Sequence, residues 1–140
     1  MSFRFLIPFL LALWLIACGE LAPPDLRQAQ ALNLQLTRSV HACINRQDWT
    51  GLHKLFAPRV RYRGRALGAA EQELPRSNFL ANYRQLLQIY HPGQFTLRQL
   101  YSAGAYHVVV EGLTTNPDTV YPICLIYTIE HHQISRVCAY

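Results

Sequence analysis

The sequence predicts a single α+β domain in which helices cover one face of a curved antiparallel sheet. In the first half of the chain, apolar residues recur mostly at helical spacing. The closing part instead reads as short strands joined by tight turns. The element order is two helices, one strand, a third helix and a run of strands, which is expected of an α+β layer. A chain of 140 residues leaves room for one core.

The chain begins with an apolar segment, Phe5 to Ala17, which follows Arg4 and precedes Cys18. Its thirteen residues are too few for the roughly 20 that a membrane-spanning helix needs, and Pro8 interrupts them. We therefore expect a cleaved signal peptide. The predicted organisation is a signal peptide, a lipidated tether and one domain, over 1–17, 18–24 and 25–140.

Two helices are predicted to open the domain. Over Asp25 to Gln47, apolar residues at steps of three and four predict a long amphipathic helix. Its apolar stripe consists of Leu26, Ala29, Leu32, Leu36, Val40, Cys43 and Ile44. A short helix then follows, with Asp48 as its N-cap and Pro58 as its end. Ser77 is predicted to cap a third helix that ends at His91-Pro92-Gly93.

The remaining elements are predicted to be strands. Arginines at 59, 61, 63 and 65 alternate with other residues, which predicts a strand with one basic face. That face could bind lipid phosphate or an acidic partner, but protection of an edge strand is the favoured interpretation. Residues 64–75 read as a loop or a short irregular strand. Four closing strands, predicted as an antiparallel meander, cover 94–102, 106–114, 119–129 and 133–139.

Three cysteines remain after Cys18, and their number is odd. A hairpin centred on His131 would place Cys124 directly opposite Cys138, which predicts a disulfide between them. The alternative is that both are small buried side chains. Cys43 would be a buried, unpaired thiol on the first helix.

The residues Leu15-Ile16-Ala17-Cys18 resemble the lipobox of bacterial lipoproteins, in which the cysteine is acylated and becomes the first residue of the mature chain. The resemblance implies lipidation at Cys18 and a lipid anchor in the cell envelope. Gly19 follows the cysteine, where an aspartate would signal retention in the inner membrane, so the resemblance implies the outer membrane, facing the periplasm. An ordinary secretory signal or an uncleaved anchor remains the alternative.

The segment from Asn45 to Tyr62 resembles the nuclear transport factor 2-like superfamily, which includes ketosteroid isomerase and polyketide cyclase-like proteins. In that family a long helix ends in a polar turn, a short helix finishes in Leu-Phe-Ala as at 55–57, and a strand follows directly. The resemblance implies a cone-shaped fold with a mostly apolar pocket for a small ligand. It also implies a catalytic carboxylate on the strand after the second helix, in those members that are enzymes.

That strand holds no carboxylate here, which disfavours catalysis without excluding it. We predict instead a ligand pocket lined by Tyr62, Tyr83, His107 and Tyr127, since tyrosine near a cavity offers an apolar ring with a polar end. His107 and Glu111 share one face of their strand, and the solvated face is favoured for both. The adjacent pair His131 and His132 would point apart, so neither a metal site nor a cofactor is predicted.

Three functions remain open. The first is an envelope lipoprotein that binds a small apolar ligand without catalysis. The second is a protein-interaction module of an envelope assembly, in which the sheet face would form a homodimer. The third is an isomerase, cyclase or hydrolase that uses His107 or Glu111. The net charge is +5, to which Arg4 contributes one charge, but no nucleic-acid-binding motif accompanies it, so no nucleic-acid partner is expected.

Overall fold

The computed structural model describes residues 25–64, 70–90, 95–116 and 119–140. The predicted signal peptide, the lipidation site at Cys18 and the tether lie outside the described residues, as does Arg65. The helices are α2 (Leu26–Asn45), α3 (Trp49–Leu55) and α4 (Arg76–Tyr90). The strands are β1 (Phe56–Arg63), β2 (Gln72–Pro75), β3 (Phe95–Ala103), β4 (His107–Asn116), β5 (Thr119–Glu130) and β6 (Gln133–Ala139).

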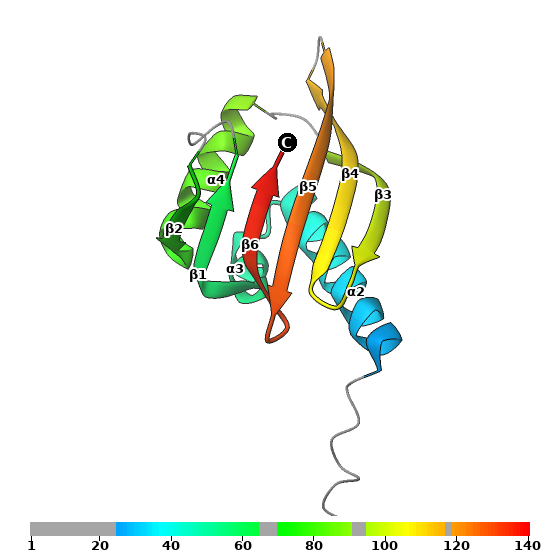
Figure 1. Cartoon of the computed structure of the whole chain (residues 1–140). Helices are drawn as coiled ribbons and strands as arrows, with labels where there is room; N and C mark the ends of the chain where they lie inside the picture. Colours follow the sequence, from blue (N-terminus) through cyan, green and yellow to red (C-terminus); the bar gives the residue numbers. More distant parts are fainter. Residues whose placement is uncertain (1–24, 65–69, 91–94, 117–118) are drawn as a thin grey trace, which may run out of the picture.

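One curved sheet forms a layer of the molecule, and the helices cover one of its faces (Figure 1). The six strands follow the order β2-β1-β6-β5-β4-β3. Strands β3 to β6 form the predicted antiparallel meander, whereas β1 and β6 run parallel. The α+β class is therefore confirmed, but a wholly antiparallel sheet is wrong. The difference arises because the chain completes β2, α4 and three further strands before β6 returns beside β1.

Local sequence signals place the two opening helices. Asp25 caps α2 by accepting a hydrogen bond from the Arg27 amide at 3.1 Å, and Asp48 caps α3 by accepting one from the Gly51 amide at 2.8 Å. The predicted end at Pro58 is wrong, because Phe56 already has extended backbone angles and begins β1. The predicted cap at Ser77 is also wrong, since α4 starts one residue earlier.

The core lies between the helices and the face of the sheet that they cover. Alternation along β4 and β5 sends Val108, Val110, Leu125 and Tyr127 to this face, which we call the concave face. Val60 and Tyr62 of β1, Val137 of β6 and Phe79 and Leu80 of α4 join them in the buried core. No helix of the described ranges packs on the opposite face, which we call the convex face (Figure 1).

The arginine-bearing strand is not at the edge of the sheet. β1 lies between β2 and β6, so its arginines do not protect an edge strand, and that interpretation is wrong. Glu73 of β2 and Glu71, which precedes it, offset part of the positive charge of β1 and β6 instead. Arg59 pairs with Glu73, and Glu71 pairs with Arg136 of β6.

The predicted disulfide between Cys124 and Cys138 is wrong, and both thiols are free. A two-residue turn at His131 and His132 and a bulge after Thr128 together shift the β5–β6 register by two residues from the predicted one. Cys138 therefore lies opposite Ile126 instead of Cys124. An even shift keeps both cysteines on the convex face but offsets them along the strands.

The buried stripe of α2 also differs from the predicted one. Asn33, Thr37 and His41 are buried, whereas Leu26 and Leu32 are 51% and 44% exposed. Leu26 is exposed because the first turn of α2 extends beyond the sheet (Figure 1). Leu32 is exposed because it lies about 100° around the helix from the buried Asn33. No helix within the described ranges is both long and apolar enough to cross a membrane.

Candidate functional site

Three of the four predicted ligand-binding residues lie together in the interior. Tyr127 projects from the concave face of β5, Tyr62 comes from β1 and Tyr83 from α4. His41 of α2 completes this group, because its Nε2 lies 3.4 Å from the Tyr127 hydroxyl. We call these four residues the interior cluster. They come from four separate elements, so only the folded chain brings them together.

His41 is the most unusual member of the interior cluster. Its side chain is buried, and burial lowers its pKa from 6.5 to about 4, which keeps the imidazole neutral at physiological pH. A neutral imidazole has one nitrogen that donates and one that accepts a hydrogen bond. Nε2 faces Tyr127, while Nδ1 has no hydrogen-bond partner within the part of the chain that the structure describes. His41 therefore offers one unused hydrogen-bonding atom, whichever nitrogen carries the proton.

The three tyrosines of the interior cluster hold their protons tightly. Burial, followed by the proximity of Tyr62, raises the pKa of Tyr83 to about 12. Burial raises the pKa of Tyr127 well above 10, and the nearby Tyr83 hydroxyl raises it further. Burial also raises the pKa of Tyr62. All three hydroxyls are therefore neutral groups that can both donate and accept a hydrogen bond at neutral pH.

Aromatic packing holds His41 and Tyr127 in place. The imidazole stacks on the Phe95 ring at a centroid distance of 4.5 Å and is tilted against the Tyr127 ring at 5.8 Å. Gly112 leaves the space that the Phe95 ring occupies, because a Cβ there would collide with that ring. The position of His41 therefore depends on a glycine of β4, the strand next to the one that carries Phe95.

A second aromatic group supports the other tyrosines. Phe79 of α4 stacks on Tyr83 at 5.5 Å and contacts Tyr62 at 6.0 Å, measured between ring centroids. Gly64 lies beneath the Tyr62 hydroxyl, in a position where any larger residue would meet it. These contacts limit the rotamers of both tyrosines and so fix where their hydroxyls point.

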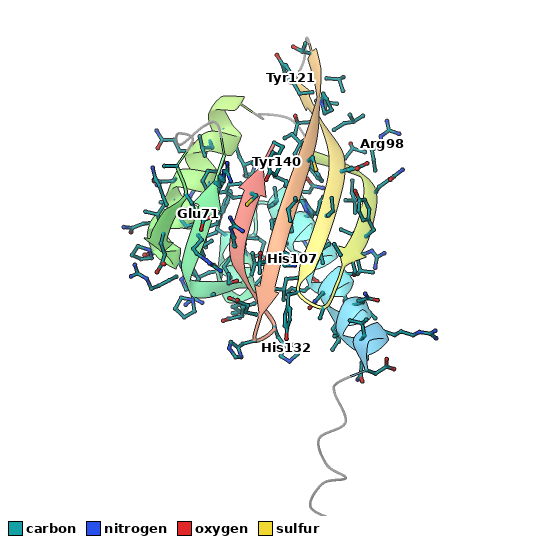
Figure 2. The ribbon with its side chains drawn as sticks, viewed as in Figure 1. Glu71, Arg98, His107, Tyr121, His132 and Tyr140 are labelled. Atoms are coloured by element: carbon teal, nitrogen blue, oxygen red, sulfur yellow. The ribbon has the colours of Figure 1, made fainter. Side chains whose placement is uncertain are left out.

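His107, the fourth predicted residue, does not join the interior cluster. Val108 and Val110 are buried on the concave face, so alternation places His107 and Glu111 on the convex face, where His107 is exposed (Figure 2). Glu111 accepts a hydrogen bond there from the Tyr101 hydroxyl at 3.1 Å. A role for His107 in ligand binding remains a prediction that its position does not favour.

The chemistry of the interior cluster is that of neutral hydrogen-bonding groups in an aromatic setting. Within the described ranges, the acidic residues are exposed or, like Glu111, lie on the convex face. The interior cluster therefore suits recognition of an uncharged polar group better than proton abstraction by a carboxylate.

Sequence reasoning missed His41, although a signal was present. Asn33, Thr37 and His41 are spaced four residues apart on the long helix and so form one polar stripe. All three prove to be buried against the sheet. A polar stripe on the buried side of an amphipathic helix is an unusual feature, because each of its groups needs a partner.

Comparison with known proteins places this geometry in a family. Residues 36–137 match the model of the SnoaL-like domain family. Among curated proteins, no sequence match was found.

Several solved structures share the fold. A proposed ketosteroid isomerase from Kribbella flavida superimposes with a TM-score of 0.66 at 21% identity, over 79% of this chain and 77% of that one. A proposed polyketide cyclase from Sinorhizobium meliloti gives 0.63 at 13% identity, over 76% of this chain and 94% of that one. A protein with a ketosteroid isomerase-like fold from Catenulispora acidiphila, in complex with trimethylamine, gives 0.59 at 18% identity, over 75% and 83%.

The family match covers most of the chain, and each of these solved structures superimposes on three quarters of it or more. The chain therefore belongs to the SnoaL-like domain family and has the nuclear transport factor 2-like fold.

Proposed function

We propose that this protein is a lipid-anchored lipoprotein of the bacterial cell envelope whose SnoaL-like domain binds a small, largely apolar ligand without catalysing a reaction. The observation that carries ligand binding is the interior cluster, and above all the unpartnered Nδ1 of the buried His41. An orphaned polar atom in the interior is costly unless something supplies its hydrogen bond.

The chemistry of the interior cluster defines the ligand class. Aromatic rings from Phe95, Phe79 and the tyrosines favour an apolar body, and neutral hydroxyl and imidazole groups favour one uncharged polar substituent such as a carbonyl or hydroxyl. A charged ligand is disfavoured, because the cluster offers no opposite charge to offset its desolvation. The Catenulispora structure supports the use of this fold for holding a small molecule.

Mass spectrometry of an organic extract from the purified full chain tests ligand binding. We expect a stoichiometric small molecule from the unmodified protein and its loss from His41→Phe and Tyr127→Phe. Tyr106→Phe is the matched control, because Tyr106 is 62% exposed and lies outside the interior cluster. An extract with no ligand, combined with no binding of added apolar carbonyl compounds, would refute the proposal.

Catalysis of the ketosteroid isomerase or cyclase type is the competing function that the family raises. The location of the acidic residues argues against it, because enzymes of this type need a base in the interior. We expect no turnover of ketosteroids by the purified chain. Turnover by the unmodified chain that is lost in His41→Phe and retained in His107→Phe would refute ligand binding without catalysis. It would show instead that the interior cluster is a catalytic site.

The lipid anchor rests on the lipobox-like residues that end at Cys18. We expect the full chain to incorporate labelled fatty acid and to fractionate with the outer membrane, because two or three acyl chains hold a protein there. Cys18→Ser should remove the label and release the protein from that fraction. Labelling that persists in Cys18→Ser would refute the anchor at this residue.

A homodimer through the convex face is a second candidate, and the composition of that face favours it. Val109, Leu113, Cys124 and Ile126 point away from the helices, and no other element of the described chain covers them. Apolar side chains on an uncovered sheet face are typical of an interface. The oligomeric state of the full chain tests this candidate.

A further inference from the structure

Exposed apolar side chains mark the end of the domain at which the described chain begins. Leu26 and Leu32 on the first turns of α2 are 51% and 44% exposed, and Tyr106 in the β3–β4 turn is 62% exposed. We call these three residues the tether-end surface. They belong to one end of the molecule, because the Asn33 amide donates to the Ala105 carbonyl at 2.8 Å and so joins α2 to that turn.

The exposure of Leu26 has a geometric cause. Leu26 precedes the buried Asn33 by seven residues, which is two helical turns, so both lie on the stripe of α2 that faces the sheet. At a rise of 1.5 Å per residue, Leu26 lies about 10 Å further along the helix axis than Asn33. The β3–β4 turn ends near Asn33, and α2 continues past it (Figure 1). The sheet-facing stripe of α2 thus extends beyond the protein core and ends in the apolar Leu26.

The length of chain before α2 limits the distance between the tether-end surface and Cys18. Only residues 19–24 separate Cys18 from Asp25, and six residues span at most about 20 Å. We infer that the tether-end surface docks on the lipid bilayer, an inference that rests on the lipid anchor at Cys18 proposed above. The anchor holds this end within reach of the membrane at all times, so even a modest apolar contact is favoured by its high local concentration.

The surroundings of the tether-end surface suit a membrane interface. Arg27 is exposed on the same turn as Leu26 and can reach lipid phosphate, while the Asp25 carboxylate is engaged in capping the helix. Tyrosine is enriched at the level of lipid headgroups, where Tyr106 would lie. An amphipathic helix end that carries leucines toward the acyl chains and an arginine toward the lipid headgroups is typical of interfacial docking.

The opposite end of the sheet supplies a matched control. Tyr121 lies near the β4–β5 tip and is 47% exposed, which resembles the exposure of Leu32. Figure 2 shows Tyr121 and His132 at opposite ends of the molecule, and His132 belongs to the turn beside Tyr106. If exposure alone decided contact with lipid, residues at both ends of the molecule would contact it equally. Docking predicts that only the tether-end surface contacts lipid.

Depth-dependent quenching by brominated lipid tests the inference on the lipidated full chain in vesicles of zwitterionic and anionic lipid. A Trp49→Phe background removes the native tryptophan of the domain, and one tryptophan is then added as Leu32→Trp or Tyr121→Trp. We expect bromine on the acyl chains to remove about half of the emission from Leu32→Trp, because an interfacial helix buries its apolar face roughly 5–10 Å deep. Emission from Tyr121→Trp should be unchanged.

The outcomes separate this inference from the proposed function. If the chain floats with the vesicles but neither tryptophan is quenched, the anchor stands and docking is refuted. If the chain stays in the aqueous fraction, the anchor fails and docking fails with it. If Leu26→Ser with Leu32→Ser halves the sedimenting mass and brominated lipid quenches neither probe, the surface binds a second copy of the chain and not the bilayer.

Discussion

His41 shows how one buried side chain sets a pH response. Burial lowers the pKa of His41 to about 4 in the folded chain, while the unfolded chain keeps a value near 6.5. Between these values the unfolded state binds the proton and the folded state does not. The free energy of unfolding should therefore fall as pH drops from 6.5 toward 4, by up to about 3 kcal/mol from this residue.

Urea unfolding at several pH values checks the contribution of His41. His41→Gln should flatten the dependence of stability on pH between 6.5 and 4.5. His107→Gln is the control, because it removes a histidine that is exposed in the folded chain. Equal slopes in His41→Gln and the unmodified protein would show that the imidazole is not buried in its neutral form.

Gly112 is needed because it has no side chain to occupy the space of the Phe95 ring. A Cβ at this position would collide with the Phe95 ring and lie 2.8 Å from the Thr96 carbonyl oxygen. Gly112→Ala should therefore lower the free energy of unfolding by about 1–3 kcal/mol through overpacking. Because Phe95 stacks on His41, the same variant should also weaken ligand binding. Thermal unfolding measures the loss of stability, and the extraction assay measures the loss of ligand. Gly104→Ala is not a suitable control, because Gly104 has a positive φ that alanine would adopt only with strain.

At the scale of the elements, the cap of α3 joins the two opening helices. Asp48 accepts from the Gly51 amide at 2.8 Å, and its carboxylate also lies 3.9 Å from the Cys43 thiol of α2. Asp48→Ala should cost about 1 kcal/mol of stability in urea unfolding. Asp48→Asn keeps an oxygen acceptor and should lose much less. Equal losses in the two variants would mean that charge, and not capping, is responsible.

The closing hairpin shows how an element can keep its place in the sequence while its register changes. The predicted bounds of β6, 133–139, agree with the structure, and those of β5 differ by one residue. The pairing of the two strands nevertheless differs by two residues, because the two-residue turn shifts it by one and the bulge after Thr128 shifts it by one more. Alternation reports which residues share a face, but it contains no information on which residues lie opposite one another.

At the scale of the whole molecule, the convex face is the surface proposed above to form a homodimer. If this face forms a homodimer, Ile126→Lys should convert the dimer into a monomer, because a buried lysine without a partner is strongly disfavoured. Analytical ultracentrifugation of the full chain in detergent measures the change. Gln85→Lys is the control, since Gln85 is exposed on α4, which packs on the other face of the sheet. A monomer before substitution would refute the dimer.

The sequence by itself determined the class of the fold and the order of its elements. Helical spacing, alternation, Asp48 and the turns act within a few residues of one another, so they can be read directly from the chain. The resemblance at 45–62 extended this reading to the family, which the family match confirms. Three tyrosines were also predicted as a group from residue type and element.

Tertiary structure alone decided which polar groups meet. His41 reaches Tyr127 across 86 positions of sequence, and its lowered pKa comes from burial by elements that the helix pattern does not specify. The exposure of Leu26 was equally hidden, because an apolar stripe predicts a buried face only as far as the surface that packs against it extends. Long-range packing sets both features, and short-range spacing cannot report it.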